Sequence, residues 1–383
     1  MPAPAAETTQ TIFFGQPRKP EADDLLVSAT GWRGGVAPAG APIKISSPRD
    51  FALGGVVAGS LAVAKGFLRI AGIDIRHHAN ITGVSLWDPA ADWRDANSDG
   101  PELQFLPQKL WMLGLGHLGQ AYLWTLGLLP YREPDQVELI LQDFDRAVAA
   151  NLGSGLLCSA DYIGWLKTRI CAQWMEDRGL RTKLIERAFG ARTVPDDDEP
   201  FVALCGFDSA AARSLLGNPG FDLVIEAGIG SDLASFDHVH LHTFPDATKK
   251  PEEIWTGEPA VTAAPELIQA FEPDARCGII AQTLAGKAIS TAFVGAIAGA
   301  FVVGEVLRGL HGGKRSEFLR FQCRRDQHPT VVHLSEKYQL RFARSGYVPA
   351  KEASPAEGQN DFRAEKVKAK SGHEVPVYSA RNR

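Results

Sequence analysis

The stretch that decides the fold runs from Lys109 to Asp145 and reads KLWMLGLGHLGQAYLWTLGLLPYREPDQVELILQDFD. It opens with a short apolar run, Lys109–Leu113, which predicts a buried strand. The glycine-rich sequence Gly114–Gly119 follows, then a helical pattern through Leu128, then a second strand-like run, Val137–Leu141. This order of strand, glycine turn, helix and strand is typical of a nucleotide-binding α/β unit.

Each glycine in this unit has a mechanical reason. Gly114 allows a tight turn, Gly116 lets backbone N–H groups approach a phosphate, and Gly119 lets the helix pack closely on the strand. The positive N-terminus of the helix would then face the anion. Asp143, 24 residues beyond Gly119, is placed to accept hydrogen bonds from a ribose. The stretch therefore predicts nucleotide binding, and a glycine turn that serves packing alone is the alternative.

The overall composition is that of a globular protein. Of its 383 residues, 45% are hydrophobic and 22% are charged, which fits one large α/β domain with extensions. A net charge of −5, without a stripe of basic and aromatic residues, argues against a nucleic-acid partner. The start, MPAPAAETTQ, lacks the basic flank and apolar core of a secretion signal, so we expect a cytoplasmic location.

Two apolar segments rich in small residues could be taken for membrane spans. Ala288–Gly304 runs 17 residues without a charge, and Phe51–Gly72 has small residues on most faces. The first is at the lower limit of a spanning length and is closely flanked by charged residues. Both segments are predicted to be buried helices of a large core, in which Gly and Ala allow close packing. We therefore expect no membrane partner.

The sequence predicts an α/β fold with a Rossmann-like, mostly parallel sheet and helices on both faces. The expected organisation has five parts: a flexible N-terminus, an N-terminal extension containing a buried Ala/Gly-rich helix, the nucleotide-binding domain, C-terminal strands, and a flexible basic tail. Their predicted boundaries are 1–22, 23–106, 107–313, 314–349 and 350–383.

Three further polar residues fall where ligands of such folds bind. Lys167 lies in a predicted helix, Asp161–Gly179, where its cation could meet phosphates; a solvated surface charge is the alternative. Asp208 follows the strand Val202–Cys205, and its carboxylate would suit a Mg²⁺ that bridges phosphates; a helix N-cap is the alternative. Asn151 is either a ligand contact or a turn residue.

Taken together, these motifs resemble the ThiF/MoeB/ubiquitin-activating superfamily, whose members adenylate the C-terminal carboxylate of ubiquitin-like proteins. The resemblance covers roughly residues 107–313, and only the combination of motifs is specific. It rests on the glycine turn, the D-x-D pair Asp143 and Asp145, Asn151-Leu152, the D-x-G-x-x-K residues Asp161, Gly164 and Lys167, Phe207-Asp208 with Arg213, and Cys277-Gly278. The N-terminal extension is also similar to that of activating proteins encoded in bacterial ubiquitin-like conjugation operons.

The resemblance implies a ThiF-type adenylation fold with ATP and Mg²⁺ as cofactors. It makes Asp143 the ribose ligand, Lys167 a phosphate ligand and Asp208 a Mg²⁺ ligand. The acyl-adenylate would then pass to a thiol, for which Cys277 is the best candidate because it follows a long connection and precedes a helix. The alternative for Cys277 is a small buried residue at a helix start. The implied partners are a ubiquitin-like protein substrate, a conjugating enzyme and a second copy of the chain.

Two residues depart from the family pattern. His117 stands where a third glycine is common, and Ser154 stands where the family has an arginine that contacts the ATP phosphates. The substitute for that arginine could come from a partner subunit or from this chain, in which the candidates are Arg146, Arg169, Arg33 and Arg69. The zinc ribbon of the family is also missing, because the five cysteines form no C-x-x-C pair, and no zinc site is expected.

Two other functions remain open from the sequence. The glycine turn and Asp143 alone would also suit an NAD-dependent oxidoreductase, although Lys167 and Asp208 have no obvious place in hydride transfer. Ser154 keeps open a non-catalytic adenylation-domain scaffold that binds a partner protein without activating it. The cysteines other than Cys277 lie in apolar or strand contexts and are expected to be structural.

Overall fold

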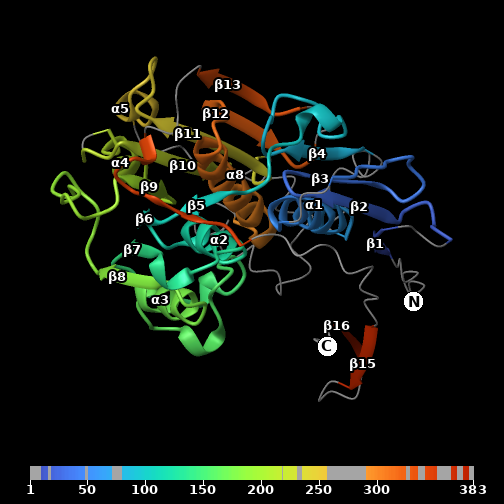
Figure 1. The fold of residues 1–383 in the computed structure, drawn as a ribbon. Coiled ribbons are helices and arrows are strands. Elements are labelled where there is room, and N and C mark those ends of the chain that lie inside the picture. The colour runs from blue at the N-terminus through green and yellow to red at the C-terminus, as the bar shows by residue number, and fades with distance from the viewer. Residues whose placement is uncertain are drawn as a thin grey trace. The chain divides into compact units, whose positions relative to one another are not determined.

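The computed structural model describes residues 10–15, 19–47, 51–70, 80–217, 219–230, 235–256, 290–324, 328–334 and 341–351, and two strands near the C-terminus. The chain separates into two units, Met1–Lys351 and Glu352–Arg383. The first unit contains an eight-stranded sheet, a four-stranded sheet and the long helices (Figure 1).

The eight-stranded sheet is the centre of the first unit, with the strand order β13-β12-β11-β10-β9-β6-β7-β8. Strands β8, β7, β6, β9 and β10 run parallel to one another, and β11 to β13 extend the sheet from β10 in antiparallel fashion. The strand bounds are β6 Lys109–Leu113, β7 Glu138–Gln142, β8 Arg181–Ile185, β9 Val202–Cys205, β10 Leu223–Ile229, β11 His238–Phe244, β12 Arg315–Gln322 and β13 Thr330–Leu334. The predicted α/β class with a mostly parallel sheet is confirmed.

The strand order places a topological switch point between β6 and β9. From β6 the chain continues to β7 and β8 on one side, and it then returns to β9 on the other side of β6. The connections that leave the carboxyl ends of β6 and β9 therefore diverge, and the general rule for open α/β sheets places a crevice between them, called here the switch-point crevice. In open α/β sheets this crevice is where ligands bind.

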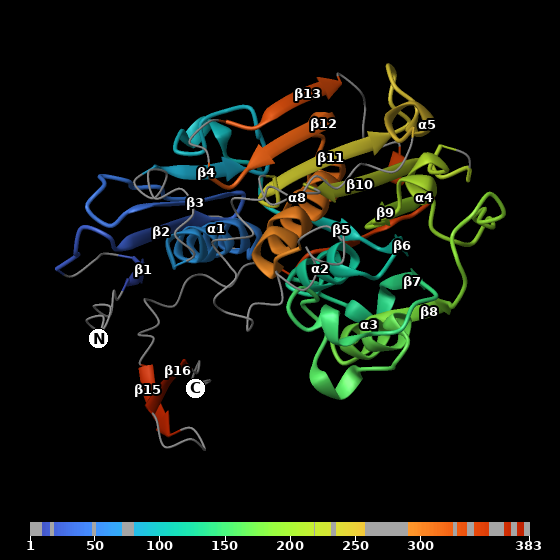
Figure 2. The same ribbon diagram turned by 180° about the vertical axis from the view of Figure 1, so that it is seen from behind.

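The long helices lie on one face of this sheet. Helices α2 His117–Leu126, α3 Lys167–Glu176 and α8 Ala292–Leu310 share one apolar core with the strands (Figure 2). The opposite face has a smaller core, next to the short helices α4 Ala210–Ser214 and α5 Pro251–Ile254. Helices thus occur on both faces as predicted, but unequally. Single 3-10 turns occur at Ala96–Ser98, Pro134–Gln136, Ala149–Asn151 and Ala160–Tyr162.

Helix α8 is buried along almost its whole length, from Val294 to Leu310. Its small residues allow α2 to approach closely: a Cβ on Gly299 would lie 2.6 Å from Thr125 Oγ1 and 2.7 Å from the carbonyl oxygen of Ala121. By length and apolar composition, α8 and α1 could each cross a membrane, but the α8 window is entirely inside the protein and that of α1 is 61% buried. Such helices are also common in the cores of soluble proteins.

The N-terminal part forms a separate four-stranded sheet, with strands β1 Ile12–Phe14, β2 Leu25–Thr30, β3 Arg33–Pro38 and β4 Thr82–Ser85 in that order. Helix α1, Leu53–Ile70, packs on β2 and β3 and also contacts α8 (Figure 1). A Cβ on Gly34 would lie 2.0 Å from the carbonyl oxygen of Gly54, so helix and strand meet backbone to backbone. The predicted buried helix is present, and its expected cap at Gly72 lies outside the described residues.

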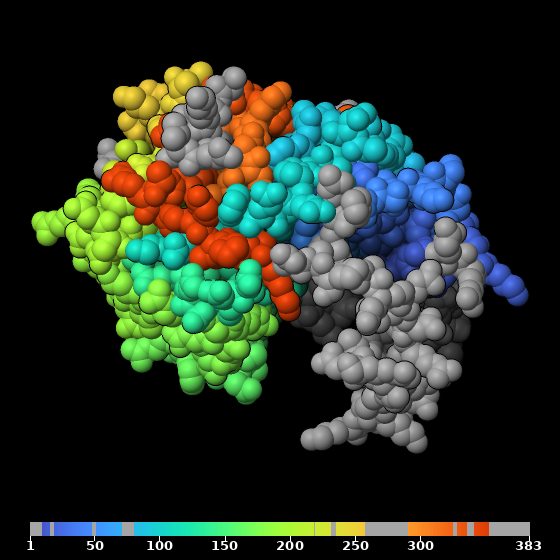
Figure 3. All heavy atoms as spheres, in the orientation of Figure 1, coloured from blue at the N-terminus to red at the C-terminus, as the bar shows by residue number. Residues whose placement is uncertain are grey.

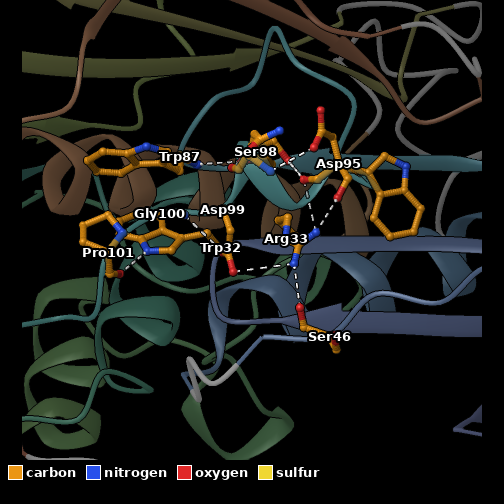
Figure 4. Close-up of polar contacts among 12 residues, drawn as sticks. Trp32, Arg33, Ser46, Trp87, Asp95, Ser98, Asp99, Gly100 and Pro101 are labelled. Carbon is orange, nitrogen blue, oxygen red and sulfur yellow. Dashed lines mark hydrogen bonds and ion pairs between the residues drawn. The ribbon is translucent and has the colours of Figure 1, made fainter.

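Arg33 holds a loop against β3 from inside the N-terminal part. Its guanidinium is 1% exposed, donates to the backbone carbonyl oxygens of Asp95 at 3.2 Å and Ser46 at 3.0 Å, and pairs with Asp99 at 3.5 Å. Figure 4 shows these contacts together with the bond that Trp32 Nε1 donates to the carbonyl oxygen of Pro101 at 2.7 Å. Arg33 is therefore committed to the architecture, and the interpretation of it as a substitute for the phosphate-binding arginine is wrong.

The C-terminal end of the first unit crosses the amino ends of the central strands. Ser345 accepts hydrogen bonds from the backbone amides of Lys109, at 3.1 Å, and Phe201, at 2.9 Å. Strand β14, Tyr347–Pro349, pairs with β5, Phe105–Pro107. The segment 341–351 runs over the surface as a red band in Figure 3. It lies at the end of the sheet opposite to the switch-point crevice.

The second unit contains an antiparallel hairpin of β15 Ala364–Lys368 and β16 Glu374–Tyr378. The sequence predicts a flexible basic tail for residues 350–383, and its flexibility stays a prediction. Alternating apolar residues, Val367 on one strand with Val375 and Val377 on the other, give the period of two that strand pairing favours.

A buried ion pair joins the N-terminal part to the core. Arg308 of α8 pairs with Glu305 one turn earlier and donates to the carbonyl oxygen of Leu86 at 3.1 Å and to Ser316 Oγ at 2.6 Å. Glu305 Oε1 accepts from the Ser316 amide at 2.8 Å. The side chains of Arg308 and Glu305 are 2% and 1% exposed, so this network links Leu86, α8 and β12 away from solvent.

We expect Arg308→Met to destabilise the protein by about 3–5 kcal/mol, because it leaves the Glu305 carboxylate buried without its charge partner. Urea unfolding, followed by circular dichroism, measures the change. Arg94→Met is the matched control: Arg94 pairs with Asp92 at the surface, with side chains 48% and 35% exposed, and such pairs contribute less than about 1 kcal/mol. Equal midpoints for Arg308→Met and wild type would show that the network does not stabilise the fold.

Candidate functional site

The glycine turn joins β6 to α2 at the switch point. Gly114 has φ +80°, and a Cβ there would lie 2.8 Å from the Phe207 ring. A Cβ on Gly119 would lie only 1.9 Å from the carbonyl oxygen of Gly114, so the helix rests on the turn itself. Gly116 is the N-cap of α2, and a Cβ there would meet no described atom within 4 Å. Gly114 and Gly119 are thus needed for packing, and Gly116 leaves open space before the helix N-terminus.

Asp143 ties this turn to the end of β7. Its Oδ2 accepts a hydrogen bond from the Leu115 amide at 2.6 Å, and its Oδ1 accepts one from the Asp145 amide at 2.7 Å. The residue is 9% exposed. Each carboxylate oxygen has two lone pairs, so both could accept a further bond from a ribose. In this structure Asp143 joins the glycine turn to the end of β7, and its role as a ribose ligand stays a prediction.

Lys167 and Asp145 form an ion pair beside the turn. Lys167 Nζ lies 2.9 Å from Asp145 Oδ2, and the lysine side chain is 11% exposed whereas the aspartate is 52% exposed. The sequence predicted a helix from Asp161, but α3 begins at Lys167, because the residues before it form a 3-10 turn and Gly164 takes φ +89°. A nearly buried ammonium needs a counter-charge, and Asp145 supplies it.

The sequence left open whether Asn151 contacts a ligand or shapes a turn, and in the structure its side chain bonds within a turn. Its Oδ1 accepts a hydrogen bond from the Val148 amide at 2.9 Å, and its carbonyl oxygen accepts one from the Gly155 amide at 2.8 Å. The loop that it shapes returns to α2, where the Leu157 amide donates to Gln120 Oε1 at 3.1 Å. Asn151 therefore organises the loop that lies against the glycine turn.

The two departures from the family pattern contact each other. His117 Nδ1 lies 2.8 Å from the carbonyl oxygen of Ser154, so Nδ1 carries the proton and donates it. The imidazole packs on Gly295 of α8, where a Cβ would lie 2.5 Å from its Cε1. Burial lowers the pKa of His117 below its usual value. His117 thus joins the start of α2 to the Ser154 loop and to α8, as a neutral ring.

Asp208 lies across the crevice, in the loop after β9. It is exposed, and among the described residues none forms a hydrogen bond or ion pair with it. The interpretation of Asp208 as a helix N-cap is wrong, because Ser209 caps α4 by accepting a bond from the Ala212 amide at 3.3 Å. A Cβ on Gly206 would lie 2.7 Å from the Gly119 amide nitrogen, so this loop packs directly on the glycine turn.

Phe207 is a site residue whose role the sequence does not reveal. Its ring lies under Gly114, and its centroid is 5.1 Å from that of the Phe189 ring. The only signal in the sequence was its place directly before Asp208. The contact between Phe207 and Gly114 depends on the pairing of β6 with β9.

The donor set fits Mg²⁺ better than a metal held by protein alone. Across the described ranges, no three His, Cys, Asp or Glu side chains gather as metal ligands. Mg²⁺ usually takes one or two carboxylates and completes its shell with water and phosphates, so the lone exposed carboxylate of Asp208 suits it. A structural zinc ion would need four protein ligands.

Three of the four described cysteines are fully buried, as structural cysteines are, and the fourth, Cys158, is partly exposed. Burial raises the pKa of the Cys171, Cys205 and Cys323 thiols, which keeps them protonated. Cys277 lies outside the described residues. Helix α8 begins at Ala292, so Cys277 does not belong to it, and the expected place of Cys277 before a helix stays a prediction.

The other arginine candidates already have protein partners. Arg146 donates to the carbonyl oxygen of Gly164 at 2.7 Å, and Arg169 donates to Glu186 at 2.9 Å. Both line a hollow of about 270 Å³ with Trp165. Arg69 pairs with Asp23 at 2.5 Å. The contacts of the described residues connect none of these arginines to the glycine turn.

Solved structures with related chain traces were found, at low similarity. The E. coli protein MccB with ATP has a TM-score of 0.40 and 14% identity, over 81% of this chain and 94% of that one. E. coli tRNA N6-threonylcarbamoyladenosine dehydratase, TcdA, has a TM-score of 0.33 and 14% identity, over 52% of this chain and 85% of that one.

Sequence comparison is more specific. The chain is 39% identical, over 297 residues, to the bacterial E1-like protein BilD of Collimonas sp. (strain OK412). The match covers 76% of this chain and 64% of the relative, so the chain spans less than two thirds of the relative's length. The motif-based resemblance to E1-like proteins is thereby confirmed.

Family models match both parts of the chain. The model of the BilD N-terminal domain matches residues 1–86, which contain β1 to β4 and α1. The model of the BilD C-terminal domain matches residues 106–313, which contain the parallel strands, the glycine turn and α8. The second match alone covers more than half of the chain, and the protein belongs to the BilD family of E1-like proteins.

Proposed function

We propose that this protein is an ATP-dependent adenylating enzyme that activates the C-terminal carboxylate of a ubiquitin-like protein. The observation that carries the proposal is the composition of the switch-point crevice. It combines an open helix N-terminus at Gly116, the cation of Lys167 and the free carboxylate of Asp208. Membership of an E1-like family supports the same reaction.

In this reaction a carboxylate oxygen attacks the α-phosphorus of ATP, an acyl–phosphate bond forms, and pyrophosphate leaves. Catalysis is then positioning and charge neutralisation. The backbone N–H groups at the start of α2 bind phosphate oxygens, and Lys167 adds a full positive charge. Asp145, which neutralises Lys167 in this structure, keeps the ammonium in place until phosphates share it. Asp208 would hold Mg²⁺, whose chemistry here is to neutralise phosphate charge.

The NAD-dependent oxidoreductase is the weaker alternative. Asp143 and the glycine turn would serve a dinucleotide as well, but hydride transfer needs neither the ammonium of Lys167 nor a carboxylate without a partner. A scaffold that binds its partner without activating it would share the fold, because Ser154 replaces the family arginine. An ATP–pyrophosphate exchange assay and a thermal-shift assay with ATP or NAD separate the three.

The proposal includes a second step and two kinds of partner. The thiolate of Cys277 would attack the acyl-adenylate, forming a thioester and releasing AMP, and a conjugating enzyme would then receive the acyl group.

We also propose a cytoplasmic homodimer. Helix α8 is buried from Val294 to Leu310, so these residues offer no surface for the dimer contact. Helix α1 does present exposed apolar residues, with Val63 51% and Ile70 90% exposed.

Gly116→Ala and Gly119→Ala should have opposite effects. The Gly116 methyl enters open space, so we expect the melting temperature to stay the same while its rise on adding ATP and Mg²⁺ is lost. The Gly119 methyl would meet the Gly114 carbonyl, so that variant should melt at a lower temperature without any ligand. Thermal-shift assays measure both. Wild type stabilised by NAD and not by ATP would instead favour the oxidoreductase.

Lys167→Ala and Asp208→Ala should each lower ATP–pyrophosphate exchange by about 100-fold or more, as expected when a preorganised charge is removed from an active site. The assay contains the candidate ubiquitin-like protein. Lys183→Ala, which removes an exposed lysine paired with Glu199, is the control and should exchange normally. Full exchange in both site variants would rule out this site. Wild type that binds the partner tightly without any exchange would indicate a scaffold.

Cys277→Ala should retain pyrophosphate exchange but form no thioester, because the thiol acts after adenylation. Non-reducing electrophoresis of the reaction, with and without a thiol reductant, detects the thioester. A reducible adduct that persists in the variant would assign the step to another cysteine.

A further inference from the structure

A carboxylate lies buried on the sheet face opposite α8. Glu226 of β10 has a side chain that is 1% exposed, so its charge requires compensation inside the protein. Its Oε1 lies 3.1 Å from Arg213 Nε of α4, and its Oε2 lies 3.2 Å from His242 Nδ1 of β11. Two elements that are far apart in sequence therefore meet at one carboxylate.

Arg213 connects Glu226 to the loop that follows β9. Its Nε donates to the carbonyl oxygen of Phe207 at 2.8 Å, and its second terminal nitrogen donates to the same oxygen. Gly228 leaves room for the guanidinium, because a Cβ there would lie 3.0 Å from it. The Phe207 carbonyl belongs to the peptide unit that ends at the Asp208 nitrogen. Holding this oxygen fixes the backbone from which the Asp208 side chain departs.

His242 is held in one orientation by aromatic neighbours. Its ring lies 6.2 Å from that of Phe244, 5.4 Å from that of Trp255 and 5.1 Å from that of Phe318. These contacts keep Nδ1 directed at Glu226. The carboxylate is thereby fixed from one side by His242 and acts on Arg213 from the other.

We propose that Glu226 and His242 are positioning residues, which set the Asp208 carboxylate and the Phe207 ring through Arg213. The proposal rests on the function proposed above, in which Asp208 acts on the phosphates. A buried ion pair is weak evidence for stability, since apolar residues often stabilise as well. Here the chain of contacts ends at a backbone carbonyl beside the crevice, directly before Asp208 and under Gly114, where a small displacement has a large effect on rate.

The first test uses Glu226→Gln and His242→Phe in the full-length protein. The second variant keeps an aromatic ring among its neighbours and removes only the contact with Glu226. His240→Phe is its matched control, because His240 lies on the same face of β11 and packs on Phe318 but is opposite Gly228. We expect kcat for pyrophosphate exchange to fall about tenfold or more in both variants, with KM for ATP nearly unchanged, as when an interaction made in the transition state is lost. His240→Phe should match wild type.

A double-mutant cycle tests whether the effect passes through Arg213. If it does, Arg213→Lys combined with Glu226→Gln should be no slower than Arg213→Lys alone, since one contact chain is broken in each case. Fully multiplicative losses, or normal kcat in His242→Phe with an intact fold, would overturn the proposal.

A second readout does not depend on catalysis. Hydrogen exchange of the peptide that covers residues 206–213 should be faster in Glu226→Gln and His242→Phe than in wild type and His240→Phe, while α8 keeps its protection. Unchanged exchange in this peptide would overturn the positioning role even if the protein had no adenylating activity. Faster exchange together with an inactive wild type would refute the proposed function and leave the contact chain standing.

Discussion

The contact between the Gly114 carbonyl and the Gly119 backbone is the constraint on which the crevice depends. No side chain fits there, because a Cβ on Gly119 would lie 1.9 Å from the carbonyl oxygen. The same closeness recurs at Gly206, which brings the loop after β9 onto the start of α2. Three glycines therefore hold two strand ends and one helix at backbone distance. Gly116, at the N-terminus of α2, faces open space, since a Cβ there would meet no described atom within 4 Å.

The local parts of this arrangement could be predicted from the sequence. Strand, turn, helix and second strand were evident from apolar runs and glycine spacing, and the positions of Asp143 and Lys167 followed from them. The start of α3 could not be predicted, because Asp161 begins a 3-10 turn, and the backbone of Gly164 delays the helix until Lys167. Contacts that depend on the strand order could not be predicted from the sequence either. Phe207 meets Gly114 only because β9 pairs with β6.

The two residues that depart from the family pattern contact each other in the structure. His117 and Ser154 looked like two separate departures, each of which weakened the motif. They are one hydrogen-bonded pair, 2.8 Å apart, that joins the helix start to the neighbouring loop. The missing arginine has no replacement among the contacts of the described residues at the turn, and Arg33 is engaged in holding the N-terminal part together. In the proposed reaction, the positive charge that neutralises the phosphates would therefore come mainly from Lys167.

The C-terminal segment that crosses the sheet affects how the chain is made. Ser345 accepts a bond from the Phe201 amide, 144 residues earlier, and also binds Lys109. During synthesis the parallel strands emerge long before this segment, with the amides at their amino ends still open to solvent. Closing so long a loop is entropically slow, so the sheet is completed late. A chain still on the ribosome that already contains β6, β9 and the glycine turn would thus still lack residues 341–351, and the amides of Lys109 and Phe201 would lack the acceptors that Ser345 provides.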